Sequence, residues 1–267
     1  MILAVALAGC GDSNLFGGSS DGSGTQADLE KGLEALDAAN WDEAIEVFSS
    51  MDTSDPDVRK YLASAYLGKA GFDTLELVER VAAAQDQGSM QSVAYDAVTQ
   101  IFDDDGDGEI TEEELGGNLE LVAKALAVFG IQPGGAAREA AAVDTGGLTD
   151  DEIFQAGVLS AIHAILGVVQ QLEYPEGSGH LLLTLDALRQ HPQAIDAVTV
   201  PAGFDDDLAW VREAVGVLSP ELLAGSSPVD GNDIADDFNQ FLFDIHYLPD
   251  EHVDDTELRQ YLHELIQ

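Results

Sequence analysis

The stretch that decides the fold class is residues 150–172, which have the sequence DDEIFQAGVLSAIHAILGVVQQL. Its apolar residues recur at intervals of three and four, as they do in an α-helix. The residues that make this helix apolar over most of its surface are Val158, Leu159, Ile162, Ile165, Leu166, Val169 and Leu172. A helix that is apolar nearly all round is buried, and an apolar run of ~15 residues is shorter than the ~20 that a membrane span needs. We therefore expect this helix at the centre of a helical domain.

Helical periodicity continues outward from this centre over almost the whole chain, and strand-like alternation is lacking. The breaks between helices fall at Pro and Gly positions such as Asp55-Pro56 and Gly146-Gly147. The sequence therefore predicts an all-α fold, a multi-helix bundle. The expected helices are 28–38, 42–51, 56–70, 74–102, 112–129, 136–143, 150–172, 179–190, 192–199, 205–217, 232–245 and 255–266.

The composition is strongly acidic, with 10 Lys and Arg against 51 Asp and Glu and a net charge of −41. Such a chain repels nucleic acid and anionic lipid headgroups, so we expect neither as a partner. A hydrophobic content of 45% separates it from disordered acidic chains. The acidity has two interpretations that stay open. It is an adaptation to a halophilic or marine environment, or its negative electrostatic field serves to raise the local concentration of cations.

The N-terminus begins with an apolar run that ends in Leu7-Ala8-Gly9-Cys10. This tetrapeptide resembles the lipobox of bacterial lipoproteins, which implies that residues 1–10 are a signal peptide and that Cys10 carries the lipid. Residues 11–26 are rich in Gly, Ser and Asp, a composition typical of a flexible tether. Gly11 stands where enterobacterial lipoproteins carry an Asp for inner-membrane retention, so the resemblance implies the outer membrane, facing the periplasm. The alternative is a buried apolar terminus with a stray cysteine.

The region 27–84 begins with a predicted helical hairpin that carries Gly32, Trp41, Ala44, Phe48 and Pro56. In the spacing of these residues the region resembles a pair of tetratricopeptide (TPR) repeats. Small residues let two helices approach closely, while the two aromatic residues fill the groove between them. The resemblance implies a groove for a protein or peptide partner that the sequence does not identify. An unrelated antiparallel helix pair is the alternative.

The strongest chemical signal is residues 103–114, DDDGDGEITEEE. They resemble the EF-hand calcium loop at every diagnostic position, with Gly108 where the loop turns sharply and Ile110 at the apolar eighth position. Calcium binds six to eight oxygen atoms, so carboxylates on alternate residues must curl around one point. The resemblance implies these calcium ligands: Asp103, Asp105, Asp107, Glu109 through its backbone carbonyl, Thr111, and Glu114 as the bidentate ligand. A solvated acidic turn is the alternative.

A second segment, residues 141–152, aligns with this loop at an offset of 38 residues. It lacks three of the carboxylates, because Ala141, Val143 and Thr145 occupy loop positions one, three and five. We expect it to bind calcium weakly or not at all, although Leu148 could pair with Ile110 and brace the first loop. A capping box that opens the following helix, Thr149 with Glu152, is a compatible alternative.

Signals for catalysis are missing from the sequence: we find no nucleophile elbow, zinc-binding His pair or phosphate-binding loop. The six histidines are scattered. We expect His163 to be a satisfied core residue, and His252 to lie in a solvated loop before a helix rather than in a metal site. The chain is therefore predicted not to be an enzyme.

Five regions follow from these patterns: the signal peptide 1–10, the tether 11–26, the TPR-like repeats 27–84, a helical region 85–172 with the EF-hand, and a C-terminal helical region 173–267. Two functional classes fit them. The first is a calcium-binding lipoprotein of the cell envelope that serves as a helical scaffold or interaction module. The second is a lipoprotein similar to the T-component of TRAP transporters, which binds a small ligand in an apolar cavity lined by helices around 158–190.

Overall fold

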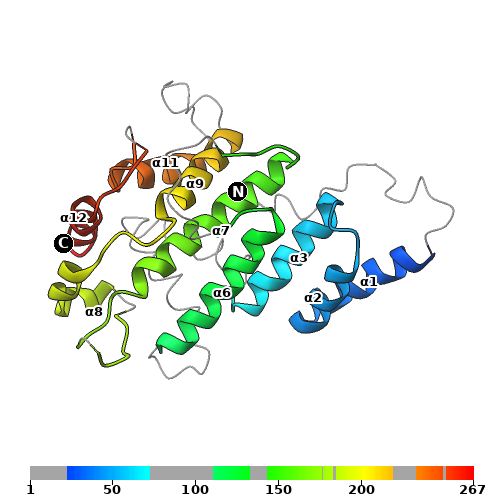
Figure 1. Ribbon diagram of the computed structural model, residues 1–267, viewed down its shortest axis with the longest axis horizontal. Helices are drawn as coiled ribbons and strands as arrows, with labels where there is room; N and C mark the ends of the chain where they lie inside the picture. Colours follow the sequence, from blue (N-terminus) through cyan, green and yellow to red (C-terminus); the bar gives the residue numbers. More distant parts are fainter. Residues whose placement is uncertain are drawn as a thin grey trace.

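The structure is a computed structural model of the 267-residue chain, and it describes residues 23–72, 111–132, 143–175, 177–182, 185–218, 233–248 and 251–267. These residues are mostly helical, as predicted. The predicted signal peptide, most of the tether and the predicted helix 74–102 lie outside them. Figure 1 shows α7 running through the middle of the molecule, with α1 to α3 toward one end and α8 and α12 toward the other.

Three helices form the N-terminal hairpins: α1 (Ser23–Asp37), α2 (Trp41–Ser50) and α3 (Pro56–Lys69). Their close approach depends on two glycines. A Cβ on Gly32 would lie 2.6 Å from the ring of Phe48, and a Cβ on Gly68 would lie 2.6 Å from the indole of Trp41. The predicted use of small residues beneath aromatic ones is therefore seen, although Trp41 packs on Gly68. This packing is compatible with TPR repeats and equally with another helix pair.

The centre consists of α6 (Glu112–Val128), α7 (Asp150–Val169) and α9 (Phe204–Leu218). α7 contacts α6, α9 and α3. Its residues Leu159, Ile162 and Leu166 are buried in the main hydrophobic core. By length and composition α7 alone among the described helices would be able to cross a membrane, but 67% of its most apolar window is buried inside the molecule. The prediction of a central core helix is confirmed.

The contact between α7 and α9 is very close. A Cβ placed on Gly157 would lie 2.3 Å from the Cβ of Ala214 and 2.9 Å from the carbonyl oxygen of Trp210. No real side chain tolerates such distances, so this glycine sets the separation of the two helices.

The C-terminal part contains α8 (Leu185–Gln190), the short 3₁₀ helix η1 (Pro192–Ala197), α11 (Asp233–Asp244) and α12 (Asp255–Leu265). α12 begins with a capping box in which the Asp254 carboxylate accepts from the amides of Thr256 and Glu257. Arg259 on α12 donates from Nε to the carbonyl of Val198, 2.6 Å away, which ties α12 to the segment after η1.

Several predicted boundaries are corrected. α1 begins at Ser23, so residues 23–26 are helical and do not belong to the tether. Residues 179–182 are not helical; they belong to a turn with two isolated antiparallel bridges, and α8 begins only at Leu185. The sequence 175–179 contains Pro175, Gly177 and Gly179, which break a helix and favour a turn. The predicted helix 192–199 is a 3₁₀ helix that ends at Ala197, and α7 ends at Val169 rather than at residue 172.

Candidate metal site and its surroundings

The predicted calcium loop lies mostly outside the described residues. Asp103, Asp105, Asp107 and Glu109 fall there, as do Cys10 and the rest of the lipobox. The described part begins at Thr111, the ninth loop position, and includes the backbone of Glu114 in the first turn of α6. The ligand set therefore stays a prediction.

The exit side of the loop is described from Thr111 onward. The carbonyl of Thr111 accepts the amide of Leu115 at 3.1 Å, which makes it the first acceptor of α6. Leu115 is fully buried, so the helix is fixed on the core from its first turn. A helix that begins within the last three loop residues is what the EF-hand resemblance implies for the exit side.

The second segment behaves as a helix cap in its described part, residues 143–152. The hydroxyl of Thr149 accepts the amide of Glu152 at 3.3 Å, and Glu152 Oε2 accepts the amide of Thr149 at 2.8 Å. The predicted capping box is thus confirmed. The left-handed residue is Gly147, with φ +89°, whereas the alignment with the calcium loop places the turn at Gly146. Pairing of Leu148 with Ile110 is untested, because Ile110 lies outside the described residues.

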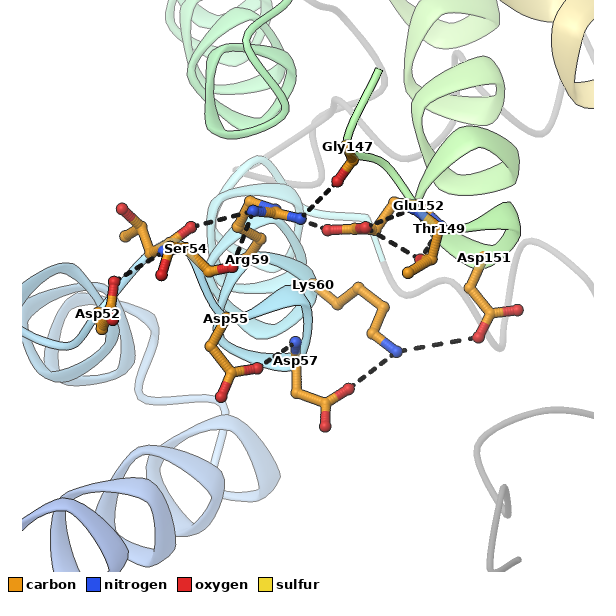
Figure 2. A network of polar contacts seen from close by, with 11 residues as sticks. Asp52, Ser54, Asp55, Asp57, Arg59, Lys60, Gly147, Thr149, Asp151 and Glu152 are labelled. Carbon is orange, nitrogen blue, oxygen red and sulfur yellow. Dashed lines mark hydrogen bonds and ion pairs between the residues drawn. The ribbon is translucent and has the colours of Figure 1, made fainter. Parts of the chain in front are cut away.

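Glu152 corresponds by alignment to Glu114, the bidentate ligand of the predicted loop. It is completely buried, and its Oε1 accepts a hydrogen bond from Arg59 Nε at 2.6 Å (Figure 2). Both carboxylate oxygens are therefore used within the chain, one by Arg59 and the other by Thr149. A guanidinium from α3 takes the place that a bound cation would have at this position.

Four of the five N–H donors of the Arg59 guanidinium have acceptors among the described residues. Its Nη1 donates to the carbonyls of Thr53 at 3.3 Å and Ser54 at 3.2 Å, and its Nη2 donates to the carbonyl of Gly147 at 3.3 Å. Figure 2 shows Arg59 between the α2–α3 connection on one side and the start of α7 on the other. Arg59 thus adds a polar link between α3 and the start of α7 to the apolar packing of Ala63 and Leu67 in the main core.

The electrostatics of this pair favour the charged forms of both groups. Burial raises the pKa of the Glu152 carboxyl, but hydrogen bonds from Arg59 and from Thr149 outweigh it, so the pKa lies below its ordinary value. The hydrogen bond to Glu152 raises the pKa of Arg59. Near the surface, Lys60 contacts Asp57 at 3.0 Å and Asp151 at 3.9 Å (Figure 2).

Histidine–aspartate pairs are the second polar feature, and two of the three in the described residues have their aspartates in the first turn of α9; the third joins His263 to Asp196 of η1 at 3.2 Å. His163 Nδ1 lies 2.7 Å from Asp207 Oδ2 between α7 and α9. Burial raises the pKa of Asp207 to about 6, although the hydrogen bond with His163 opposes this shift. His252 Nδ1 lies 2.6 Å from Asp205 Oδ2, and this hydrogen bond raises the pKa of His252. His163 is thus a satisfied core residue and His252 lies in a loop before α12, both as predicted.

None of these pairs forms part of a larger reactive group in the described ranges. Ser160 stands one helical turn before His163, but its hydroxyl is buried and makes no hydrogen bond with any described residue. No three His, Cys, Asp or Glu side chains of the described residues converge to hold a metal ion. Ser160 and His163 therefore form no hydrogen-bonded nucleophile–base pair of the kind that covalent catalysis requires.

Lysine and arginine are neutralised within the chain. Of the ten in the sequence, Arg80 and Arg138 lie outside the described residues, and each of the remaining eight contacts a carboxylate. The acidic surplus is therefore left for solvent ions or a cationic partner to balance.

Sequence analysis did not find Arg59 as the partner of Glu152, nor the turn around His180. The scarcity of cations was a usable signal for the first, because each of the ten Lys and Arg in a chain with 51 Asp and Glu is expected to pair with a carboxylate. The Pro and Gly residues between 175 and 179 were the signal for the second.

A scan against models of protein families gave no match, and neither did a search of curated proteins or of solved structures.

Proposed function

We propose that this chain is a calcium-binding lipoprotein of the cell envelope, without enzymatic activity, that serves as a helical scaffold or interaction module. The observation that carries the proposal is the sequence 103–114, which has every diagnostic residue of an EF-hand loop and runs directly into α6. Lipidation at Cys10 would hold the domain at the outer membrane, facing the periplasm.

Calcium has a structural role in this proposal. Extracellular calcium modules bind with dissociation constants of roughly 10⁻⁴–10⁻³ M, so the site stays filled where calcium is abundant. The residues from Leu115 onward are already anchored in the core by α6. A filled loop would therefore fix the chain that precedes α6 against this rigid helix.

The N-terminal hairpins α1 to α3 are the proposed partner-binding part, for a protein that is not yet identified. The burial of α7 in the core supports the scaffold over the T-component-like alternative, in which helices around 158–190 line a ligand cavity. The net charge of −41 also disfavours capture of small organic anions.

Calorimetric titration with calcium tests the metal site. The wild-type protein is expected to bind one calcium ion, and Asp103→Ala or Glu114→Ala to abolish binding. Glu113→Ala is the matched control, because it removes the same charge from the adjacent position, which is not a ligand in the EF-hand pattern. Equal loss of binding in Glu113→Ala and Glu114→Ala would mean that the acidic field, and not a loop, attracts calcium.

The anchor is tested separately by membrane fractionation. Cys10→Ser is expected to move the protein from the membrane to the soluble fraction, since stable anchoring comes from the attached acyl chains. Unchanged fractionation would contradict lipidation at this position.

A further inference from the structure

The segment 251–266 lies along the stretch 189–212 and runs in the opposite direction. As the segment advances, the partners of its polar contacts recede along the chain. In order, these contacts are Glu251 with Arg212, Val253 with Asp205, Asp255 with Val200, Arg259 with Val198 and Ile266 with Arg189. This segment, the C-terminal strap, is therefore docked over its whole length.

Three apolar side chains attach the strap to the main core. Val253, Leu258 and Leu262 are buried there, in the same core as Ile195 and Val198 of the stretch that the strap contacts. Undocking of the strap would expose these side chains to water, which is unfavourable. The apolar contacts therefore keep the strap closed in the folded protein, and the polar contacts fix its position.

Two histidine–aspartate contacts lie near the two ends of the strap. His252 Nδ1 lies 2.6 Å from Asp205 Oδ2, and His263 Nε2, in the last turn of α12, lies 3.2 Å from Asp196 Oδ1. Both histidines belong to the strap, and both aspartates belong to the stretch that it contacts. A neutral imidazole offers only a hydrogen bond in such a contact, whereas a protonated imidazole also brings a positive charge.

The other charges on both sides of this contact are mostly negative. With neutral histidines, the strap has one Arg against five Asp and Glu, a net charge of −4, and the stretch 189–212 has two Arg against four Asp, a net charge of −2. Like charges repel across the contact. Protonation of both histidines reduces the charge of the strap to −2 and places each new positive charge beside an aspartate.

The charged groups that face His252 favour its protonated form. They are Asp205 on α9 and, from the strap itself, Asp254 and Glu257. The hydrogen bond with Asp205 contributes most to raising the pKa of His252 above its ordinary value. Arg212, the cation of α9, is paired with Glu251.

At the other end of the strap, Asp196 of η1 is the acid that His263 contacts, and Glu264 follows it on α12. The two cations at this end donate to backbone carbonyls. Arg189 of α8 donates from Nε to the Ile266 carbonyl at 3.0 Å, and Arg259 donates from Nε to the Val198 carbonyl at 2.6 Å. A proton on His263 therefore meets a carboxylate on the facing element.

We propose that the C-terminal strap is a pH-sensitive closure: protonated His252 and His263 hold it on the segment 196–205, and it opens more often when they lose their protons. The contacts are independent of the proposed calcium site. Exposed ion pairs are individually weak, so the two contacts adjust how often the strap opens, while the buried apolar residues set its closed position.

The direction of the effect follows from the raised pKa of His252. A histidine whose pKa is higher in the docked state stabilises that state fully below the ordinary pKa of 6.5. This contribution is lost as the pH rises through the raised value. The strap is therefore held most firmly at slightly acidic pH and least firmly at alkaline pH.

Hydrogen exchange of the full chain at pH 6 and pH 8 tests the closure. After correction for the intrinsic exchange rate at each pH, amides of residues 258–265 are expected to be at least about three-fold less protected at pH 8. They should also be less protected than the amides of α7, because the strap opens by itself. Equal protection of the strap at the two pH values, or strap protection equal to that of α7, would overturn the proposal.

The double variant His252→Gln, His263→Gln shows whether the two histidines cause the pH dependence. Glutamine keeps a hydrogen-bond donor but does not titrate, so protection of the strap should become equal at the two pH values. His246→Asn is the matched control: it removes an exposed histidine from the turn after α11, where φ is +62° and asparagine is tolerated. It should keep the pH dependence. An unchanged pH dependence in the double variant would overturn the proposal.

NMR titration of the imidazole protons provides a second measurement, which does not depend on opening of the strap. The midpoint of His252 is expected above 6.5 in the wild type. Asp205→Asn should lower it toward that value, while the asparagine oxygen still accepts the Val253 amide. A wild-type midpoint at or below 6.5, or no change in Asp205→Asn, would contradict the proposed role of this contact.

Discussion

The two segments 103–114 and 141–152 resemble each other in sequence, but the cation that neutralises their last glutamate, Glu114 or Glu152, has a different source in each. Glu114 belongs to a loop with carboxylates at positions one, three and five, the pattern that binds an exchangeable calcium ion. Glu152 lies behind Ala141, Val143 and Thr145, and its carboxylate is bonded to Arg59. In the second segment the positive charge beside the glutamate is the Arg59 side chain. In the first segment it is proposed to be a calcium ion taken up from solution.

The difference has a physical consequence for stability. An ion pair inside the chain is present at any calcium concentration, but it costs desolvation of two charges and depends on both partners. A calcium loop contributes only where calcium exceeds its dissociation constant. The N-terminal hairpins are therefore attached to the core independently of calcium, through the packing of α3 in the main core and through Arg59, and only the region before α6 is expected to respond to the metal.

Removal of Arg59 is expected to give the largest effect. Arg59→Met leaves the Glu152 carboxylate buried without a cation, which typically costs about 3–5 kcal/mol in the free energy of unfolding. Urea denaturation at pH 7 measures it. The loss should shrink as the pH falls below the ordinary pKa of 4.5 and through the depressed pKa of Glu152, because protonation removes the buried charge in both proteins.

Lys60→Met is the control for this experiment. Lys60 follows Arg59 on α3 but forms pairs near the surface, with Asp57 and Asp151, that are worth at most about 1 kcal/mol. A similar loss in both variants would mean that the buried pair carries no special stability.

Asp207 is a buried carboxylate like Glu152, but its partner is His163 rather than a permanently charged arginine. Its pKa is raised from 3.8 to about 6, so the folded state favours the protonated form, and stability is lost as the pH rises between these values. Asp207→Asn keeps an acceptor for His163 and is expected to increase stability at pH 8 by up to about 3 kcal/mol.

The gain from Asp207→Asn should disappear near pH 4, where the wild-type carboxyl is largely protonated in the folded state. Urea denaturation at the two pH values checks this. A loss of stability at pH 8 would show instead that the charge of Asp207 contributes favourably through its contact with His163.

The third expectation separates the two segments directly. At 10 mM calcium, a site with a dissociation constant of 10⁻⁴–10⁻³ M adds about 1–3 kcal/mol to the free energy of unfolding. Arg59→Met should keep this increment in full, and Glu114→Gln should lose it. If Arg59→Met abolished the calcium effect, the two segments would be coupled and would not obtain their cations independently.

The smallest effect concerns the turn of the second segment. Gly147 has φ +89°, a conformation that costs an alanine about 1–2 kcal/mol. Gly147→Ala should therefore destabilise the protein by this amount in thermal unfolding, and Gly146→Ala by less, since a Cβ there meets only the movable side chain of Asp144. The opposite order would indicate that the segment turns as a calcium loop does.

Local sequence signals predicted much of this fold. The apolar stretch 150–172 correctly gave the central helix α7, and the Thr149–Glu152 capping box correctly marked its start. Asp55-Pro56 likewise marks the start of α3, where the Asp55 carboxylate accepts the Asp57 amide. These features depend on residues within one helical turn of each other, so the sequence alone specifies them.

The features that sequence analysis missed depend on distant residues or on competing signals. Arg59 and Glu152 are 93 positions apart, and nothing local in either segment identifies the other. The turn around residues 175–179 lies between two helices, and the apolar residues Leu181 and Leu182 extended the predicted helix 179–190 too far toward its N-terminus. There the backbone pairs with Glu173 and Thr111 instead, which periodicity does not reveal.

The contact at Gly157 limits how this molecule can change over time. Position 157 has no room for a methyl group, and its neighbour Ala214 has only a methyl group to give up. A glycine at 214 would remove only one of the two close contacts, because the backbone carbonyl oxygen of Trp210 would still lie 2.9 Å from a Cβ at position 157. In related chains we therefore expect position 157 to stay glycine even where residue 214 changes, which keeps the spacing of α7 and α9 and with it the contact of His163 with Asp207.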